Sequence, residues 1–271
     1  MKKNTAEAQV VIPLPSPKSI LKQKVGLTDI SVEYFRPRSK GRAIFGNLVP
    51  YGKIWRTAAN ANTKITFSTD ISFDGHFLKK GTYALFAIPD EKSWEMIFYS
   101  DTENWGAPNV WHYAKIAAQL KITPQVLPMK IDTFTIAIDD ITDSSAVLGL
   151  LWDNTYAGIK FEVPTDDIVI PNIKNTLAEN PKAMDYYFAA VYYSRNNKDI
   201  KQAGEWMEKA MSMMERPSFR QLRQQSIIYA KIGMKEKAVE VARRSLEDAK
   251  VAKDEEFINL NMASLKEWGA I

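Results

Sequence analysis

The chain lacks cysteine altogether, and His76 and His112 are the only imidazoles among its 271 residues. Without thiols it can form no disulfide, no zinc–thiolate or iron–sulfur centre, and no cysteine nucleophile. A histidine metal site would need both imidazoles together with carboxylates, so we expect no metal and no cofactor. The absence of cysteine suits the cytosol and an oxidising compartment equally, so it does not decide the location.

Long apolar runs and a large excess of one charge are also missing. No segment approaches the roughly 18–20 apolar residues of a membrane-spanning helix. The 36 Lys and Arg residues are offset by 32 Asp and Glu residues, which leaves a net charge of +4. Because these charges are spread along the chain, they do not indicate nucleic-acid binding. We therefore expect neither a membrane span nor a nucleic-acid partner.

The N-terminus carries parts of a secretory signal. Met1-Lys2-Lys3 is typical of its positive start and Ala6-Glu7-Ala8 of its cleavage site, but the apolar core between them is missing. Two interpretations stay open: an exported protein whose mature part begins near Gln9, and an ordinary flexible cytosolic N-terminus. We favour the first, which predicts a periplasmic, outer-membrane-associated or secreted protein with residues 1–14 as a flexible N-terminus or signal remnant.

Residues 15–165 have the pattern of an all-β domain. Short alternating segments such as Ile30–Tyr34 and Lys64–Ser68 are separated by turn residues, and Asp74-Gly75 is a hairpin signal. A last hairpin is predicted from Ser145–Trp152 and Tyr156–Val163. The pattern predicts an antiparallel β-sandwich of about nine or ten strands.

Residues 166–181 are predicted to be a linker with a short helix, and residues 182–271 an all-α domain. Ala203 and Ala210 recur as Ala238 and Ser245, 35 residues further on, as in tetratricopeptide-like repeats. A plain helical bundle is the alternative. Such repeats often bind proteins, so we expect a protein partner on this domain. A face with Tyr187, Tyr192, Tyr193 and Trp206 would bind a peptide or contact the sandwich. The predicted helices are Ala183–Arg195, Ile200–Glu215, Phe219–Ile232, Lys235–Lys250 and Glu255–Trp268.

The segment from Arg36 to Arg56 is the most unusual part of the chain. It contains six basic residues and no acid, with Gly and Pro residues typical of a loop. Guanidinium groups match carboxylate, sulfate and phosphate, and flat rings stack on sugars. We therefore predict a site for an anionic or glycan ligand. The alternative is a structural crossover, in which an Arg pairs with a buried acid and a Trp fills the core. The candidate ligand residues here are Arg36, Lys40, Arg42, Tyr51, Trp55, Arg56 and Asn60.

A second loop, Asn104–Tyr113, brings two Trp, a Tyr and a His together and could form an aromatic cleft. Trp105 and His112 complete the candidate ligand residues, although a lone His beside aromatic residues more often serves packing. No nucleophile, metalloprotease or phosphate-loop motif is present. We predict no catalytic residue. A hydrolase would need carboxylates from distant segments, such as Asp70, Asp101, Glu103 or Asp132.

Many short motifs in residues 15–163 occur in order in a known family. The chain resembles the family of domain of unknown function 2911. The resemblance implies an exported envelope protein with a helical C-terminal segment, and implies no activity. This family often has Gly where the chain has Ala58, which matters if that backbone needs a positive φ. The motifs include Tyr34-Phe35-Arg36-Pro37, Lys40-Gly41-Arg42, Ile44-Phe45-Gly46, Leu48-Val49-Pro50-Tyr51-Gly52, Trp55-Arg56, Ala59-Asn60 and Gly81-Thr82-Tyr83-Ala84-Leu85-Phe86.

These observations favour a non-enzymatic envelope protein that binds a ligand or partner through two regions, the basic loop (Arg36–Asn60) and the helical repeats. A glycan- or peptide-directed hydrolase and a structural subunit of an envelope complex are the alternatives.

Overall fold

The computed structural model describes residues 12–271, so the predicted signal elements Met1-Lys2-Lys3 and Ala6-Glu7-Ala8, with the mature start near Gln9, lie outside the described residues. The chain divides into two compact units, of which the first ends at Ile168 and the second runs from Val169 to Ile271. In residues 12–271, no helix combines the length and the apolar character that crossing a membrane requires.

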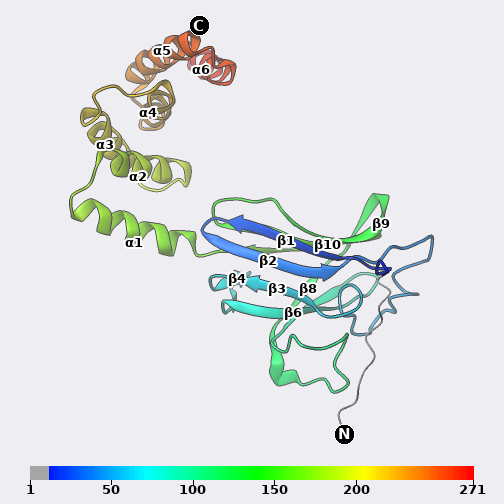
Figure 1. The fold of residues 1–271 in the computed structure, drawn as a ribbon. Coiled ribbons are helices and arrows are strands. Elements are labelled where there is room, and N and C mark those ends of the chain that lie inside the picture. Colours follow the sequence, from blue (N-terminus) through cyan, green and yellow to red (C-terminus); the bar gives the residue numbers. More distant parts are fainter. Residues whose placement is uncertain (1–11) are drawn as a thin grey trace. The chain divides into compact units, whose positions relative to one another are not determined.

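The first unit consists of two antiparallel sheets, as the sequence predicts (Figure 1). Six strands form one sheet in the order β1-β2-β3-β6-β7-β8, and four form the other in the order β5-β4-β10-β9. The strands are β1 (Lys18–Val25), β2 (Thr28–Phe35), β3 (Thr63–Phe67), β4 (Ile71–Phe73), β5 (His76–Leu78), β6 (Gly81–Ile88), β7 (Trp94–Tyr99), β8 (Ile116–Ile122), β9 (Gln125–Asp139) and β10 (Ser145–Glu162). Of these, β1 and β8 are not among the strands individually predicted.

The core lies between the two sheets, where alternate side chains of each strand point inward. In β2 every second residue from Thr28 to Tyr34 is buried. Phe98 of the six-stranded sheet meets Phe73 of the four-stranded sheet with ring centroids 5.0 Å apart, and Phe67 meets Phe161 at 6.1 Å. This interlocking of rings makes the first unit a sandwich.

Strands β6 and β7 are apolar on both faces. Their inward side chains join the main core, while Phe86 and Tyr99 point to the other face and are fully buried there. Ile54 and Trp111 from two loops cover that face, and Trp111 stacks on Tyr99 with centroids 4.5 Å apart. A sheet covered on both faces explains why the sequence of β6 is a continuous apolar run.

The predicted hairpin across Asp153-Asn154 is wrong, because β10 continues through these residues as one strand that pairs with β9. The register shifts on both sides of Asp153, whose φ is 52°. Asp tolerates the left-handed conformation both in a hairpin turn and in an irregularity of a strand, so its turn signal was ambiguous.

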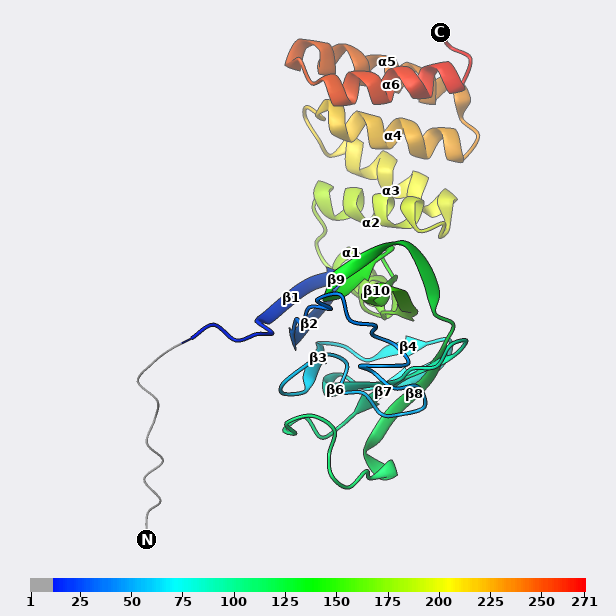
Figure 2. The ribbon, with the colours of Figure 1, turned by 90° about the vertical axis from the view of Figure 1, so that its right-hand side faces the viewer.

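Six helices follow the sheets: α1 (Thr165–Ala178), α2 (Ala183–Arg195), α3 (Ile200–Ser212), α4 (Phe219–Lys231), α5 (Lys235–Ala252) and α6 (Glu255–Glu267). Most of the predicted linker is therefore α1. From α2 to α6 each helix packs against the next one along the chain (Figure 2). Asp199 and Ser218 cap α3 and α4 through side-chain hydrogen bonds to backbone N–H groups.

The small residues that recur after 35 positions lie at helix contacts. Ala203, Ala210, Ala238 and Ser245 are all fully buried, and Gly233 has the positive φ of a helix C-terminus. Two of the aromatic residues expected on a partner-binding face serve packing instead. Tyr187 is buried in the core of α2, α3 and α4, and Trp206 is half-buried against the same core.

We expect Ala238→Leu to lower the free energy of unfolding of the helical unit by about 1–3 kcal/mol, because three added carbon atoms have no room at a fully buried helix contact. Ala263→Leu, at an exposed position of α6, is the matched control and should leave stability nearly unchanged. Urea unfolding followed by circular dichroism measures both. Equal effects of the two substitutions would contradict the close packing at Ala238.

Candidate functional site

A cavity of about 480 Å³ opens beside the basic loop of the sandwich. Five of the nine predicted ligand residues line it: Lys40, Arg42, Trp55, Arg56 and Asn60. The others that line it come from the start of the chain, the same loop and β10: Pro15, Ser16, Pro37, Arg38, Leu48, Val49, Ala58, Ala59 and Trp152. We call this cavity the basic pocket.

Two indole rings lie at the bottom of the basic pocket. Trp55 and Trp152 stack with centroids 6.0 Å apart and an interplanar angle of 17°. Trp55 also contacts Phe45, Trp94 and Phe134, and it exchanges two backbone hydrogen bonds with Ala87 of β6. Only 9% of Trp55 is exposed. Its main role is to fill the core, as the structural alternative predicts, and its remaining surface belongs to the basic pocket.

The two indole N–H groups differ. Nε1 of Trp152 donates to the backbone oxygen of Asp132 at 3.2 Å. Nε1 of Trp55 has no acceptor in the described part of the chain, where no polar side-chain atom is both buried and unpaired. The N–H of Trp55 is therefore accessible, and it can donate a hydrogen bond to a bound molecule.

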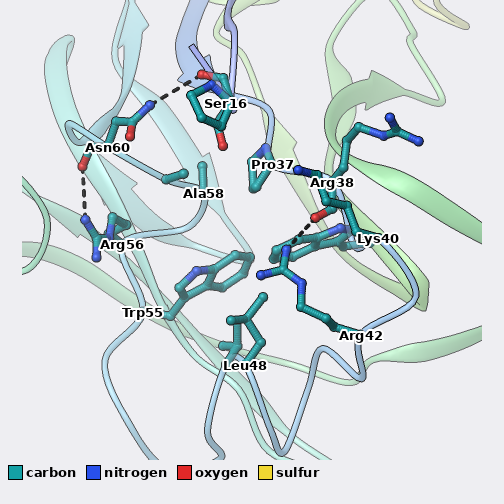
Figure 3. Close-up of a pocket in the computed structure, with 14 residues that line it drawn as sticks. Ser16, Pro37, Arg38, Lys40, Arg42, Leu48, Trp55, Arg56, Ala58 and Asn60 are labelled. Carbon is teal, nitrogen blue, oxygen red and sulfur yellow. Dashed lines mark hydrogen bonds between the residues drawn. The ribbon is translucent and has the colours of Figure 1, made fainter.

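Arg42 is positioned by its own loop (Figure 3). Its Nε donates to the backbone oxygen of Ser39 at 2.8 Å, and its Nη2 donates to that of Arg38 at 2.7 Å. Neither partner carries a charge, so these contacts leave the positive charge of the guanidinium without a compensating negative charge. The two bonds orient Arg42 and leave Nη1 with both hydrogens available to a ligand.

Arg56 is held from the opposite direction by the segment that follows it. Nη1 donates to the backbone oxygen of Asn60 at 3.2 Å, and the Asn60 side chain donates to the backbone oxygen of Ser16. The guanidinium packs on Gly106, where an added Cβ would lie 3.0 Å from Nη1. Gly106 also has a φ of +100°, so this position requires glycine.

Arg38 is the one pocket arginine that pairs with an acid. Its Nε donates to Asp132 Oδ2 at 2.6 Å, while Oδ1 accepts from the Ser39 hydroxyl and the Lys40 backbone N–H. Hydrogen bonds from Ser39 and Arg38, with that from Lys40, lower the pKa of Asp132 to about 2. Asp132 thus anchors the turn at residues 38–40, although it does not itself line the basic pocket.

Four of the predicted ligand residues lie elsewhere. Arg36 is a structural contact, because it donates to the backbone oxygen of Phe134 and to the Thr135 hydroxyl. Tyr51 is 38% exposed and its ring covers Gly46. Trp105 is 75% exposed, and His112 is exposed with its backbone N–H bound to the Tyr99 hydroxyl. These four side chains are not among those that line the basic pocket.

The carboxylates that a hydrolase would need are each bound to a cation. Asp70 pairs with Lys79, Asp101 with Lys115 and Glu103 with Lys64, at 2.7 to 2.8 Å. Hydrogen bonds from these lysines hold the pKa of each carboxyl below its usual value. A lowered pKa keeps these carboxyls ionised near neutral pH, which does not suit the role of a general acid. Across residues 12–271 no cluster of His, Asp and Glu side chains is suited to hold a metal ion.

The wall of the basic pocket between Trp55 and Asn60 is strained. Thr57, Ala58 and Asn60 have φ values of 50°, 145° and 59°. A non-glycine residue in the region of Ala58 costs on the order of 1–3 kcal/mol. The surrounding hydrogen bonds maintain this conformation, among them that from the Thr63 hydroxyl to the backbone oxygen of Thr57 at 2.6 Å.

We expect Ala58→Gly to raise the free energy of unfolding by about 1 kcal/mol, because the relief of strain exceeds the added entropy of the unfolded chain. Ala59→Gly is the matched control at an adjacent pocket residue without a positive φ, and it should lower stability by about 0.4–1 kcal/mol. Chemical unfolding of both variants measures the difference. Destabilisation by Ala58→Gly would contradict the strain.

We also expect Asp132→Asn to destabilise the sandwich at neutral pH. A pKa below the ordinary 3.8 stabilises the folded state above that pH, and this contribution disappears as the pH falls towards 2. Urea unfolding across this range should show the variant and the wild type converging at low pH. A constant difference down to pH 2 would show that the carboxylate charge is not the cause.

No curated protein matches this chain, and no solved structure matches it. The model of a family described as protein of unknown function (DUF2911) matches residues 16–161, more than half of the chain. This stretch contains every residue of the basic pocket except Pro15. The chain therefore belongs to the DUF2911 family of proteins of unknown function.

Proposed function

We propose that the sandwich of this protein is a binding module for small organic anions, and that the basic pocket is its site. The observation that carries the proposal is the charge of the lining residues. Arg38, Lys40, Arg42 and Arg56 line the cavity, and no Asp or Glu does. A concave site with charges of one sign attracts the opposite charge and strengthens its binding.

The guanidinium groups are already oriented before a ligand binds, and this supports the proposed function. Backbone oxygens already orient the guanidinium groups of Arg42 and Arg56, so little side-chain entropy is lost when an anion binds. Their remaining N–H groups can form charge-assisted hydrogen bonds to carboxylate, sulfate or phosphate oxygens. An oriented set of donors, with no carboxylate or imidazole among the lining residues to act as a general base, favours binding over catalysis.

The apolar floor of the basic pocket suits an anion that also carries a ring or a hydrocarbon group. The indoles of Trp55 and Trp152, with the side chains of Pro37, Leu48 and Val49, offer apolar surface beside the cations. Apolar contact of this kind adds about 25 cal/mol for each Å² of ligand surface removed from water. We therefore favour a small molecule with a ring or hydrocarbon frame over an inorganic ion.

The location and the helical domain complete the proposal. We propose an exported protein, periplasmic, secreted or associated with the outer membrane, on the signal-like residues Lys2, Lys3 and Ala6–Ala8 and on the family resemblance. A protein partner on α2–α6 stays a prediction. The hydrolase alternative has no support in the basic pocket, because none of its four candidate carboxylates lines it.

We expect wild-type protein to bind phenyl phosphate in isothermal titration calorimetry, and Arg42→Gln to weaken that binding about tenfold or more, since a hydrogen bond to a charged group contributes about 1.5–3 kcal/mol. Lys40→Gln should weaken it as well without removing a side-chain contact to the loop. Arg244→Gln, at an exposed arginine of α5, is the matched control and should bind as the wild type does.

Two outcomes would contradict the proposal. One is that wild-type protein binds none of phosphate, sulfate, benzoate and phenyl phosphate at millimolar concentration. The other is that Arg244→Gln lowers the affinity as much as Arg42→Gln does, because binding would then follow the overall charge of the protein. Thermal unfolding of each variant separates loss of binding from loss of folding.

A further inference from the structure

We infer that the natural ligand of the basic pocket is a compact polyanion, with at least two acidic groups on one flat frame, and not a neutral saccharide. This inference rests on the proposed function and names the class of ligand. It follows from three features of the basic pocket: its balance of donors and acceptors, the number of its uncompensated charges, and their placement around Trp55.

The side chains that line the basic pocket offer many hydrogen-bond donors, and only the Ser16 hydroxyl and the Asn60 amide oxygen among them can accept. Arg42, Arg56, Lys40 and the N–H of Trp55 are donors. The backbone oxygens of Ser16, Arg38 and Asn60 already accept hydrogen bonds from pocket side chains. Saccharide hydroxyls donate as well as accept, so a sugar with several hydroxyls would find more donors than acceptors here and leave some of its own donors unpaired. Carboxylate, sulfonate and dianionic phosphate oxygens only accept, and they match this lining.

Three of the four cations lack a compensating charge. Asp132 pairs with Arg38 and with no other side-chain cation. Among the described residues, Lys40, Arg42 and Arg56 form no ion pair with Asp or Glu. One negative charge would therefore leave the basic pocket with an excess of positive charge. A ligand with two or three negative charges balances it and gains a second charge-assisted contact.

The cations are placed on two sides of the floor. Figure 3 shows Trp55 between Arg56 and Arg42. Arg56 belongs to the segment before Asn60, and Arg42 belongs to the turn after Arg38. A ligand that reaches both guanidinium groups has to pass over the indole. A flat frame with an acidic group at each end fits this arrangement better than one acidic group does.

The experiment compares ligands that share one frame and differ in charge. Calorimetric titrations would use benzoate, isophthalate and benzene-1,3,5-tricarboxylate, which carry one, two and three carboxylates at pH 7.5. Benzene-1,3-disulfonate and phenyl phosphate test whether the acid type matters, and maltose represents neutral saccharides. We expect isophthalate to bind about tenfold or more tightly than benzoate, with an affinity that falls more steeply as NaCl is added.

Variants show whether the preference comes from the two arginines. Arg42→Gln and Arg56→Gln should each reduce the preference for isophthalate over benzoate, whereas Arg244→Gln should keep it. Because Arg56 also supports the loop at Gly106, Lys40→Gln provides a second pocket variant without such a contact. It should lower the affinity for the tricarboxylate more than that for benzoate.

The outcomes separate this inference from the proposed function. Equal affinity for benzoate and isophthalate, or a preference for isophthalate that every pocket variant retains, would contradict the inference that the ligand is a polyanion. The proposed anion site would not be contradicted by either result. Tight binding of maltose would overturn the polyanion as well. If no anion of the series binds, the proposed function itself is wrong.

Discussion

The cluster of aromatic rings around Trp55 is the contact on which the sandwich and its site both depend. Trp94 comes from the six-stranded sheet, Phe134 and Trp152 come from the four-stranded sheet, and Trp55 touches all three. Through its backbone Trp55 also pairs with β6. One residue of an irregular loop thus joins both sheets and forms the bottom of the basic pocket. The packing of the core and the lining of the basic pocket therefore share one set of side chains.

The charges above this floor are arranged by hydrogen bonds to the backbone more than by ion pairs. Asp132 compensates Arg38 and fixes the turn that carries Lys40, while backbone oxygens hold Arg42 and Arg56. Orientation by neutral groups keeps the positive field of the site, since a carboxylate partner would cancel it. The strained backbone at Ala58 belongs to the same arrangement, because it brings Asn60 within reach of both Arg56 and Ser16.

The packing of the helical unit depends on small residues and on one buried polar network. Its helices pack in chain order, and the recurring small residues Ala203, Ala210, Ala238 and Ser245 are buried between them. A buried polar network supports the last three helices: Arg223 of α4 donates to Asn261 of α6, which donates to Ser245 of α5. This network contains no Asp or Glu, and burial lowers the pKa of Arg223. Small residues and this network let a unit of only a few helices keep a defined packing.

The sequence by itself determined most of the helices and strands and one exclusion in the chemistry. Alternation identified β2 and β3, recurring small residues indicated the helical repeats, and the absence of cysteine excluded thiol chemistry. These features are local, because a strand or helix shows its buried face in its own residue pattern. Asp153 shows the limit, since its left-handed conformation suits a hairpin and an irregular strand alike.

Only the tertiary structure decided which residues of the basic loop line the same pocket. Arg38 pairs with Asp132, 94 residues away, Arg36 binds β9, and Trp105 and His112 lie outside the basic pocket. No residue pattern predicts these outcomes, because side-chain directions in a Gly- and Pro-rich loop have no period. They follow from long-range contacts that exist only once the two sheets have closed on Trp55.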